Sequence, residues 1–125
     1  MLSLLRFALL ALICAVSPAA QAESIHILVQ SSPLAGSQYH ALAEVRAKLH
    51  VGDALALVRE ADNRHDRYAV RVEWRGHLLG YVPRAENRAV ATALDSGERL
   101  QARIATLRDE PDPWRRLTFE VLLRL

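Results

Sequence analysis

The chain has 125 residues, of which 51% are hydrophobic, and its formal net charge is +2 at pH 7. This length suits one domain, and the apolar content is too high for a disordered chain. A charge this close to zero creates no strongly basic face, so composition alone does not indicate nucleic-acid binding. The function must therefore be read from motifs.

The first 22 residues have the pattern of a secretory signal peptide. Arg6 is their only charged residue, the run from Phe7 to Val16 is apolar, and Ala20-Gln21-Ala22 is an A-x-A cleavage site. This run is too short to cross a bilayer core of roughly 30 Å. We therefore expect cleavage after Ala22, an exported protein that is periplasmic or secreted, and no stable membrane span. The alternative is an uncleaved anchor.

The only cysteine, Cys14, lies inside this apolar run. Cleavage would leave residues 23–125, the expected folded domain, without a thiol. A disulfide framework, a thiol nucleophile and a cysteine metal site are then excluded.

Alternation of apolar and polar residues predicts at least six strands. In chain order they are 25–30, 54–59, 68–74, 78–82, 100–107 and 117–125. Segment 43–49 is ambiguous, because Val45, Ala47 and Leu49 alternate like a strand whereas Leu42, Val45 and Leu49 fit a helical stripe. We favour a seventh strand there.

Turn residues and one alanine-rich stretch complete the prediction. Arg75-Gly76-His77 predicts a tight turn that joins two strands into a hairpin. One α-helix is expected over about 84–96, since it follows Pro83 and Gly97 suits the position just past its end. Six or seven short strands with one helix predict a mainly β protein that forms a small, partly closed β-barrel.

Two loops hold the candidate functional residues. The segment from Glu60 to Arg67 has seven polar or charged residues among eight. It can be a solvated turn in which Asp62 and Asn63 form Asx turns, or it can be a binding loop. In the loop 31–40, Tyr39 is either a stacking platform or the start of the next strand.

Catalytic and metal motifs are weak in this sequence. The five histidines lack the spacing of a helix-borne metal site, and Asp62, His65 and Asp66 in one loop make a poor ligand set. Glu60 and Asp66 are a possible acid–base pair, but no neighbouring residue visibly couples them. We expect no metal, no cofactor and no enzymatic activity.

Several blocks resemble the HIRAN domain family, in its order and at compatible spacings over about residues 25–125. The most specific is the acidic Asp-Asn-x-x-Asp loop followed by Ala-Val. The blocks are Gly36-Ser37-Gln38-Tyr39-His40, Gly52-Asp53, Arg59 to Asp66, Ala69-Val70, and Gly80 to Asn87. The resemblance implies a compact barrel similar to an OB-fold. It also implies capture of single-stranded DNA that ends in a free 3′-hydroxyl.

The resemblance also implies roles for individual residues. Tyr39 would stack on a base, Asp66 would accept a hydrogen bond from the 3′-hydroxyl, and Asn63 would hold the acidic loop in shape. Flanking arginines would follow the backbone as possible phosphate contacts: Arg64, Arg67, Arg84 and Arg88.

Three positions depart from the DNA-binding members of the family. His65 stands in place of a second tyrosine, Gln38 in place of an arginine, and Tyr81 where a histidine can contact the backbone. The changes imply weaker stacking, which is worth about 1–3 kcal/mol per base, and the loss of a phosphate contact.

Two functions remain open at this stage. One is a non-catalytic module that binds single-stranded DNA at its 3′ end. The other is an exported interaction module on the same barrel with a peptide, glycan or envelope partner. Convergence of Tyr39, His65 and Asp66 on one concave, arginine-rich surface would favour the first. A buried Tyr39 or a neutral surface would favour the second.

Overall fold

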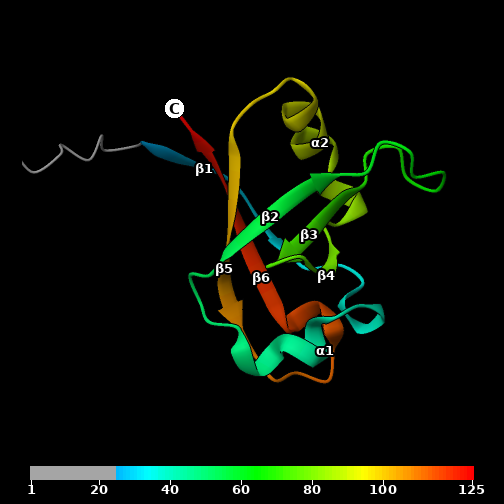
Figure 1. The fold of residues 1–125 in the computed structure, drawn as a ribbon, viewed down its shortest axis with the longest axis vertical. Coiled ribbons are helices and arrows are strands. Elements are labelled where there is room, and N and C mark those ends of the chain that lie inside the picture. Colours follow the sequence, from blue (N-terminus) through cyan, green and yellow to red (C-terminus); the bar gives the residue numbers. More distant parts are fainter. Residues whose placement is uncertain (1–24) are drawn as a thin grey trace, which may run out of the picture.

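Six antiparallel strands form a sheet in the order β1-β6-β5-β2-β3-β4 (Figure 1). The computed structural model describes residues 25–125, so the signal-like segment and Cys14 lie outside the described residues. The strands are β1 (His26–Pro33), β2 (Ala54–Arg59), β3 (Val70–Trp74), β4 (His77–Tyr81), β5 (Leu100–Leu107) and β6 (Leu117–Arg124). The six predicted strands are all present, and their ends differ from the predicted ends by at most three residues.

The β3–β4 hairpin follows the predicted pattern. Val70, Val72 and Trp74 are buried on one face of β3. Trp74 pairs with His77 across the turn. Arg75 and Gly76 have φ angles of 45° and 81°. Positive φ at both central residues gives the turn a twist that matches the strands it joins.

The predicted strand over 43–49 is wrong. This segment is helical, with α1 (Leu42–Val45) followed by the 3₁₀ helix η2 (Arg46–Lys48). Leu42, Val45 and Leu49 are buried, whereas Ala47 is exposed. The helical stripe prevails because its three large side chains reach the core, while the strand alternation would have buried a small alanine in place of Leu42.

The helix expected over about 84–96 is confirmed in part. The 3₁₀ helix η3 (Arg84–Glu86) comes first, and α2 (Arg88–Asp95) follows it after Asn87. Gly97 has a φ of 76°, as expected for a residue just past a helix end. The helical segment is interrupted at Asn87, whose side chain donates a hydrogen bond to Asp66 of the acidic loop.

A closed barrel is not confirmed. Between β4 and the chain after β1 there is one bridge, Ala35–Tyr81, with two backbone hydrogen bonds of 2.9 Å. No ladder extends it within residues 25–125. The strand β1 ends at Pro33, which has no N–H to donate, and the chain then turns into the 3₁₀ helix η1 (Ser37–Tyr39). The fold is therefore a mainly β open sheet with two short α-helices.

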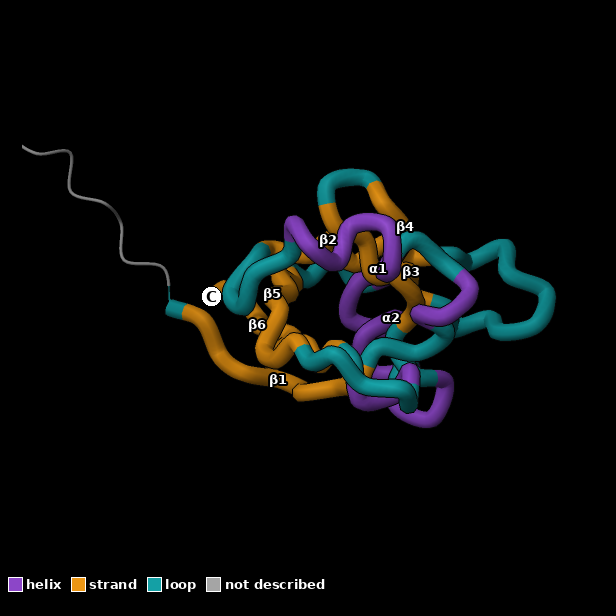
Figure 2. The backbone as a smooth tube through the Cα atoms, turned by 90° about the horizontal axis from the view of Figure 1, so that it is seen from below, coloured by secondary structure: helices purple, strands orange, loops and turns teal. Residues whose placement is uncertain are grey.

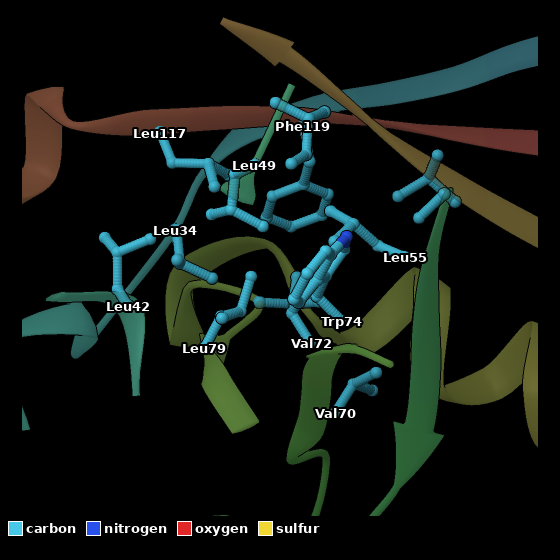
Figure 3. Close-up of a cluster of buried hydrophobic side chains, with 14 of the residues drawn as sticks. Leu34, Leu42, Leu49, Leu55, Val70, Val72, Trp74, Leu79, Leu117 and Phe119 are labelled. Carbon is cyan, nitrogen blue, oxygen red and sulfur yellow. The ribbon is translucent and has the colours of Figure 1, made fainter. Parts of the chain in front are cut away.

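The core lies on the concave side of this sheet, where Phe119, Trp74 and Leu79 pack together (Figure 3). In Figure 1, α1 and α2 lie at opposite ends of the molecule. The loop between β2 and β3, residues 60–69, projects beyond the ends of both strands (Figures 1 and 2). Within residues 25–125 there is no helix with the length and apolar character to span a membrane.

Candidate functional site

Asn63 folds the acidic loop around its own side chain. Its Oδ1 accepts hydrogen bonds from the backbone N–H groups of His65 (2.9 Å) and Asp66 (3.0 Å). Its Nδ2 donates to Glu60 Oε1 at 2.8 Å. The first two bonds form an Asx turn, which lets an asparagine replace a backbone turn. The Asx turn expected at Asn63 is therefore present, and it gives the loop a defined shape.

The base of the loop is closed from the strand side. The backbone N–H of Glu60 donates to the carbonyl of Ala69 at 2.9 Å. The Arg59 guanidinium donates to the carbonyls of Ala69 and Arg67, and its Nε pairs with Asp95 of α2 at 3.1 Å. These contacts close the base of the loop and tie it to β2 and, through Arg59, to α2.

Asp66 is held at both carboxylate oxygens. Its Oδ1 accepts from the backbone N–H of Tyr68 at 2.9 Å. Its Oδ2 accepts from Asn87 Nδ2 at 2.7 Å. Asn87 is 1% exposed and is the N-cap residue just before α2, yet its side chain makes no capping bond. The carboxylate has little freedom to rotate, because each oxygen has a donor from a different chain segment.

Two adjoining hollows surround Asp66, with volumes of about 390 and 220 Å³. Both are lined by Asn63, His65, Asp66 and Arg84. We call them together the loop hollow. Arg64, Arg67, Tyr68 and Asn87 complete the larger part, and Ala35 and Tyr81 contribute to the smaller part.

Three of the four arginines from the sequence analysis line the loop hollow, namely Arg64, Arg67 and Arg84. The fourth, Arg88, lies beside the ring of Tyr68, with its guanidinium carbon 5.5 Å from the ring centroid. Arg67 lies 4.9 Å from the same centroid and donates to the Tyr68 hydroxyl at 3.0 Å. Tyr68 therefore positions two arginines beside the hollow, through contacts between cations and the face of an aromatic ring.

Tyr81 lies at the back of the loop hollow. Its hydroxyl donates to Glu60 Oε2 at 3.0 Å, and its ring lies 5.7 Å from the ring of His40. Burial, followed by the hydrogen bond and the negative charge of Glu60, raises the pKa of the Tyr81 phenol, and Arg71 opposes this shift. Because its proton is directed at Glu60, Tyr81 offers the hollow ring surface rather than a free O–H.

Tyr39 and Gln38 lie outside the loop hollow. The Tyr39 side chain is 79% exposed, and Gln38 lines a different hollow. The sequence analysis asked whether Tyr39, His65 and Asp66 converge on one concave, arginine-rich surface, and the structure meets this criterion in part. His65 and Asp66 converge with three arginines, while Tyr39 is neither buried nor part of their wall. The nearest link is Ala35, which lines the loop hollow just before Tyr39's 3₁₀ helix.

Sequence reasoning missed Asn87 and Tyr68 as members of the site. Asn87 lies in the block that resembles the family, but nothing local indicates that it is buried against Asp66. The alternating pattern placed Tyr68 on the core-facing side of a strand, and only the structure shows its ring beside Arg67 and Arg88. Another hollow, of about 680 Å³ along α2, contains only Arg88 of the proposed residues. In the described range 25–125, no group of three or more His, Cys, Asp and Glu side chains could hold a metal ion.

Comparison with known proteins now assigns the fold to a family. The family model named HIRAN domain matches residues 27–125. The chain belongs to the HIRAN domain family. As a family, HIRAN domains are nucleic-acid-binding modules. No curated protein matches the chain.

Two crystal structures are similar to this HIRAN domain. A protein from Lactobacillus plantarum is 28% identical with a TM-score of 0.67, and the similarity covers 81% of this chain and 96% of that one. The HIRAN domain of human HLTF is 16% identical with a TM-score of 0.60, and the similarity covers 81% of this chain and 77% of that one. At 16% identity the second similarity shows the fold alone.

Proposed function

We propose that this HIRAN domain binds single-stranded nucleic acid and receives a free 3′-hydroxyl at Asp66. The observation that carries the proposal is the fixed carboxylate of Asp66 in a hollow lined by three arginines. The acceptor is specific for a donor at the strand end, and the arginines attract the phosphates that precede it.

The chemistry of Asp66 favours a hydroxyl end. An ionised carboxylate only accepts hydrogen bonds, and its two oxygens have about four lone-pair sites. Tyr68 and Asn87 occupy one site on each oxygen, so further acceptor capacity remains. A 3′-hydroxyl can donate to it, whereas a 3′-phosphate brings a like charge. Asp66 would therefore select an end and not a base sequence.

Affinity would come from the surroundings of Asp66. Arginines contact phosphates in a salt-dependent way, while an exposed aromatic ring stacks on any base. Arg64, Arg67 and Arg84 are placed for the first role, and the exposed ring of Tyr39 for the second.

The test is fluorescence anisotropy with a labelled single strand, ending in a 3′-hydroxyl or a 3′-phosphate, at two salt concentrations. We expect the hydroxyl end to bind at least about tenfold tighter, equivalent to about 1.4 kcal/mol. The preference should vanish in Asp66→Ala. Arg99→Ala is the matched control, since Arg99 is exposed and lines neither part of the loop hollow.

Equal affinity for the two ends would contradict end recognition. No saturable binding of either strand at low salt would contradict nucleic-acid binding altogether. The exported module with a peptide, glycan or envelope partner would then be the function to pursue.

Two further properties belong to this proposal. We propose that the domain acts by binding alone, which predicts that a bound strand is recovered with unchanged mass.

We also propose export, from the pattern of residues 1–22. Mass spectrometry of the protein recovered outside the cytoplasm should find an N-terminus at Glu23, and a purely cytoplasmic full-length protein would contradict export.

A further inference from the structure

A second hollow, of about 480 Å³, lies where the chain around η1 and α1 meets the loop after β5. We call it the arginine hollow, since Arg46, Arg108 and Arg116 line it together with Ser37 and Gln38. None of these arginines figures in the candidate site derived from the sequence.

The arginine hollow contains buried polar atoms that lack partners. Ser37 is 2% exposed, and its Oγ makes no hydrogen bond with any residue in 25–125. Arg46 Nε is also buried without a partner among these residues. A buried donor without an acceptor costs about 1–3 kcal/mol, so such atoms usually face a ligand or ordered water. The two residues that carry these atoms, Ser37 and Arg46, both line the arginine hollow.

Three arginines and two carboxylates, those of Asp109 and Glu110, line the hollow, and the excess of positive charge favours an anion. Arg46 contacts Asp109 at 3.4 Å, but the Asp109 side chain is 90% exposed, and an exposed pair of this kind is weak. Arg116 donates to the carbonyls of Glu110 (2.8 Å) and Pro111 (3.0 Å), which fixes the loop that forms the wall. The exposed Arg108 makes no side-chain hydrogen bond or ion pair within residues 25–125. A serine hydroxyl and two arginines with unused donors form a suitable set for phosphate oxygens.

We infer that the arginine hollow binds a backbone phosphate of the same strand whose 3′ end lies at Asp66. This inference rests on the proposed function and extends its footprint. The segment 35–38 connects the two places, since Ala35 lines the loop hollow while Ser37 and Gln38 line the arginine hollow. Tyr39, exposed on the same 3₁₀ helix, offers its ring to a base on the way.

The arginine hollow would supply cationic groups beside the uncharged Gln38. The resemblance places a phosphate-binding arginine there in DNA-binding members. In this chain Arg46 and Arg108 provide cationic groups in the hollow that Gln38 lines.

The test compares single strands of about ten nucleotides, a length typical of the site on one small single-strand-binding domain, with strands of about three nucleotides, both ending in a 3′-hydroxyl. The proteins are the wild type, Arg108→Ala, Ser37→Ala/Arg108→Ala and the control Arg99→Ala. In Arg108→Ala we expect affinity for the longer strand to fall about fivefold and the salt slope to fall by about 0.7. The short strand and the preference for a 3′-hydroxyl should be unaffected, and the double variant should bind the longer strand more weakly still.

Each outcome separates this inference from the proposed function. Unchanged affinity and salt slope in Arg108→Ala, with end preference still lost in Asp66→Ala, would overturn the second phosphate site alone. A weaker Arg108→Ala without any end preference in the wild type would support the arginine hollow and overturn capture of the end. Absence of strand binding by the wild type would overturn both.

Discussion

Residues of the same short segment, 35–38, line both the loop hollow and the arginine hollow. The two hollows differ in whether their polar side chains have hydrogen-bond partners within the protein. In the loop hollow, Asp66 has a donor at each oxygen and Asn63 is hydrogen bonded through both its amide atoms. In the arginine hollow, Ser37 Oγ and Arg46 Nε are buried without partners in the described chain.

The difference shows what each place can recognise. The Asp66 carboxylate, which two donors hold in one orientation, can accept a hydrogen bond from an incoming O–H group. The polar groups of the arginine hollow that lack an acceptor would instead favour an anion. A nucleic-acid strand offers both, because its 3′-hydroxyl donates and its phosphates accept. Substitutions at the residues that form or support the two hollows test whether this difference in hydrogen bonding determines what each hollow binds.

The largest effect is expected at Gly80, which supports the segment shared by both hollows. A Cβ at Gly80 would overlap the carbonyl oxygen of Ala35 and approach the Leu34 side chain to 2.9 Å. We expect Gly80→Ala to lower the free energy of unfolding by about 3 kcal/mol, measured by urea denaturation, since packed backbone must shift. Gly76→Asn is the control, because its Cβ would meet open space and asparagine tolerates positive φ. Equal losses in the two variants would show that the close approach is unimportant.

Asn87→Ala should have the next largest effect, because it removes the buried donor to Asp66. We expect about 2 kcal/mol lower stability and a smaller preference for the 3′-hydroxyl over the 3′-phosphate. Thermal unfolding and anisotropy measure the two quantities. Full retention of the end preference would mean that the backbone N–H of Tyr68 alone orients the carboxylate.

Tyr39→Ala should weaken strand binding about tenfold, since stacking is worth about 1–3 kcal/mol per base. The melting temperature should not change, because the side chain is 79% exposed. Tyr39→Phe retains the ring and should bind like the wild type. If the phenylalanine variant bound as weakly as the alanine variant, stacking would not be the role of this residue.

His65→Tyr should tighten strand binding about threefold, because it adds a larger aromatic face to the loop hollow. His50→Tyr provides the control, since His50 is exposed and lines neither the loop hollow nor the arginine hollow. An equal gain in the two variants, followed in the same anisotropy titration, would indicate a nonspecific effect of the added tyrosine.

Ser37→Ala should have the smallest effect on stability, a gain of up to about 1 kcal/mol, because it removes a buried hydroxyl that has no partner in the described chain. The contrast with Asn87→Ala compares two buried polar side chains, one partnered and one not. A loss above about 1 kcal/mol in urea denaturation would reveal a stabilising contact to water or chain that the serine makes in the free protein.

Local patterns predicted the elements well where a strand or turn depends on neighbouring residues. The alternation in β3, the turn at Arg75-Gly76 and the Asx turn of Asn63 all follow from side chains a few positions apart. The segment after Tyr39 was predicted wrongly because both periods fit it, and only the position of the core decides between Ala47 and Leu42.

The candidate site was predictable as a set of residues but not as an arrangement. The acidic loop drew attention to Asn63, His65 and Asp66, which the structure brings together. The sequence analysis did not identify Asn87 as a site residue, because it is distant in sequence from Asp66, to which it donates a hydrogen bond. The separation of Tyr39 and Gln38 from Asp66 depends on the Ala35–Tyr81 bridge, which no local pattern indicates.

The sequence by itself determined the six strands, the tight turn, the shape of the acidic loop and the membership of the family, since these depend on periodicity and on short motifs. Only the tertiary structure decided that the sheet stays open and that Asn87 fixes Asp66. It also decided that the basic side chains are divided between two hollows. These features arise from contacts between residues far apart in the chain, where the choice of partner depends on how the whole core packs.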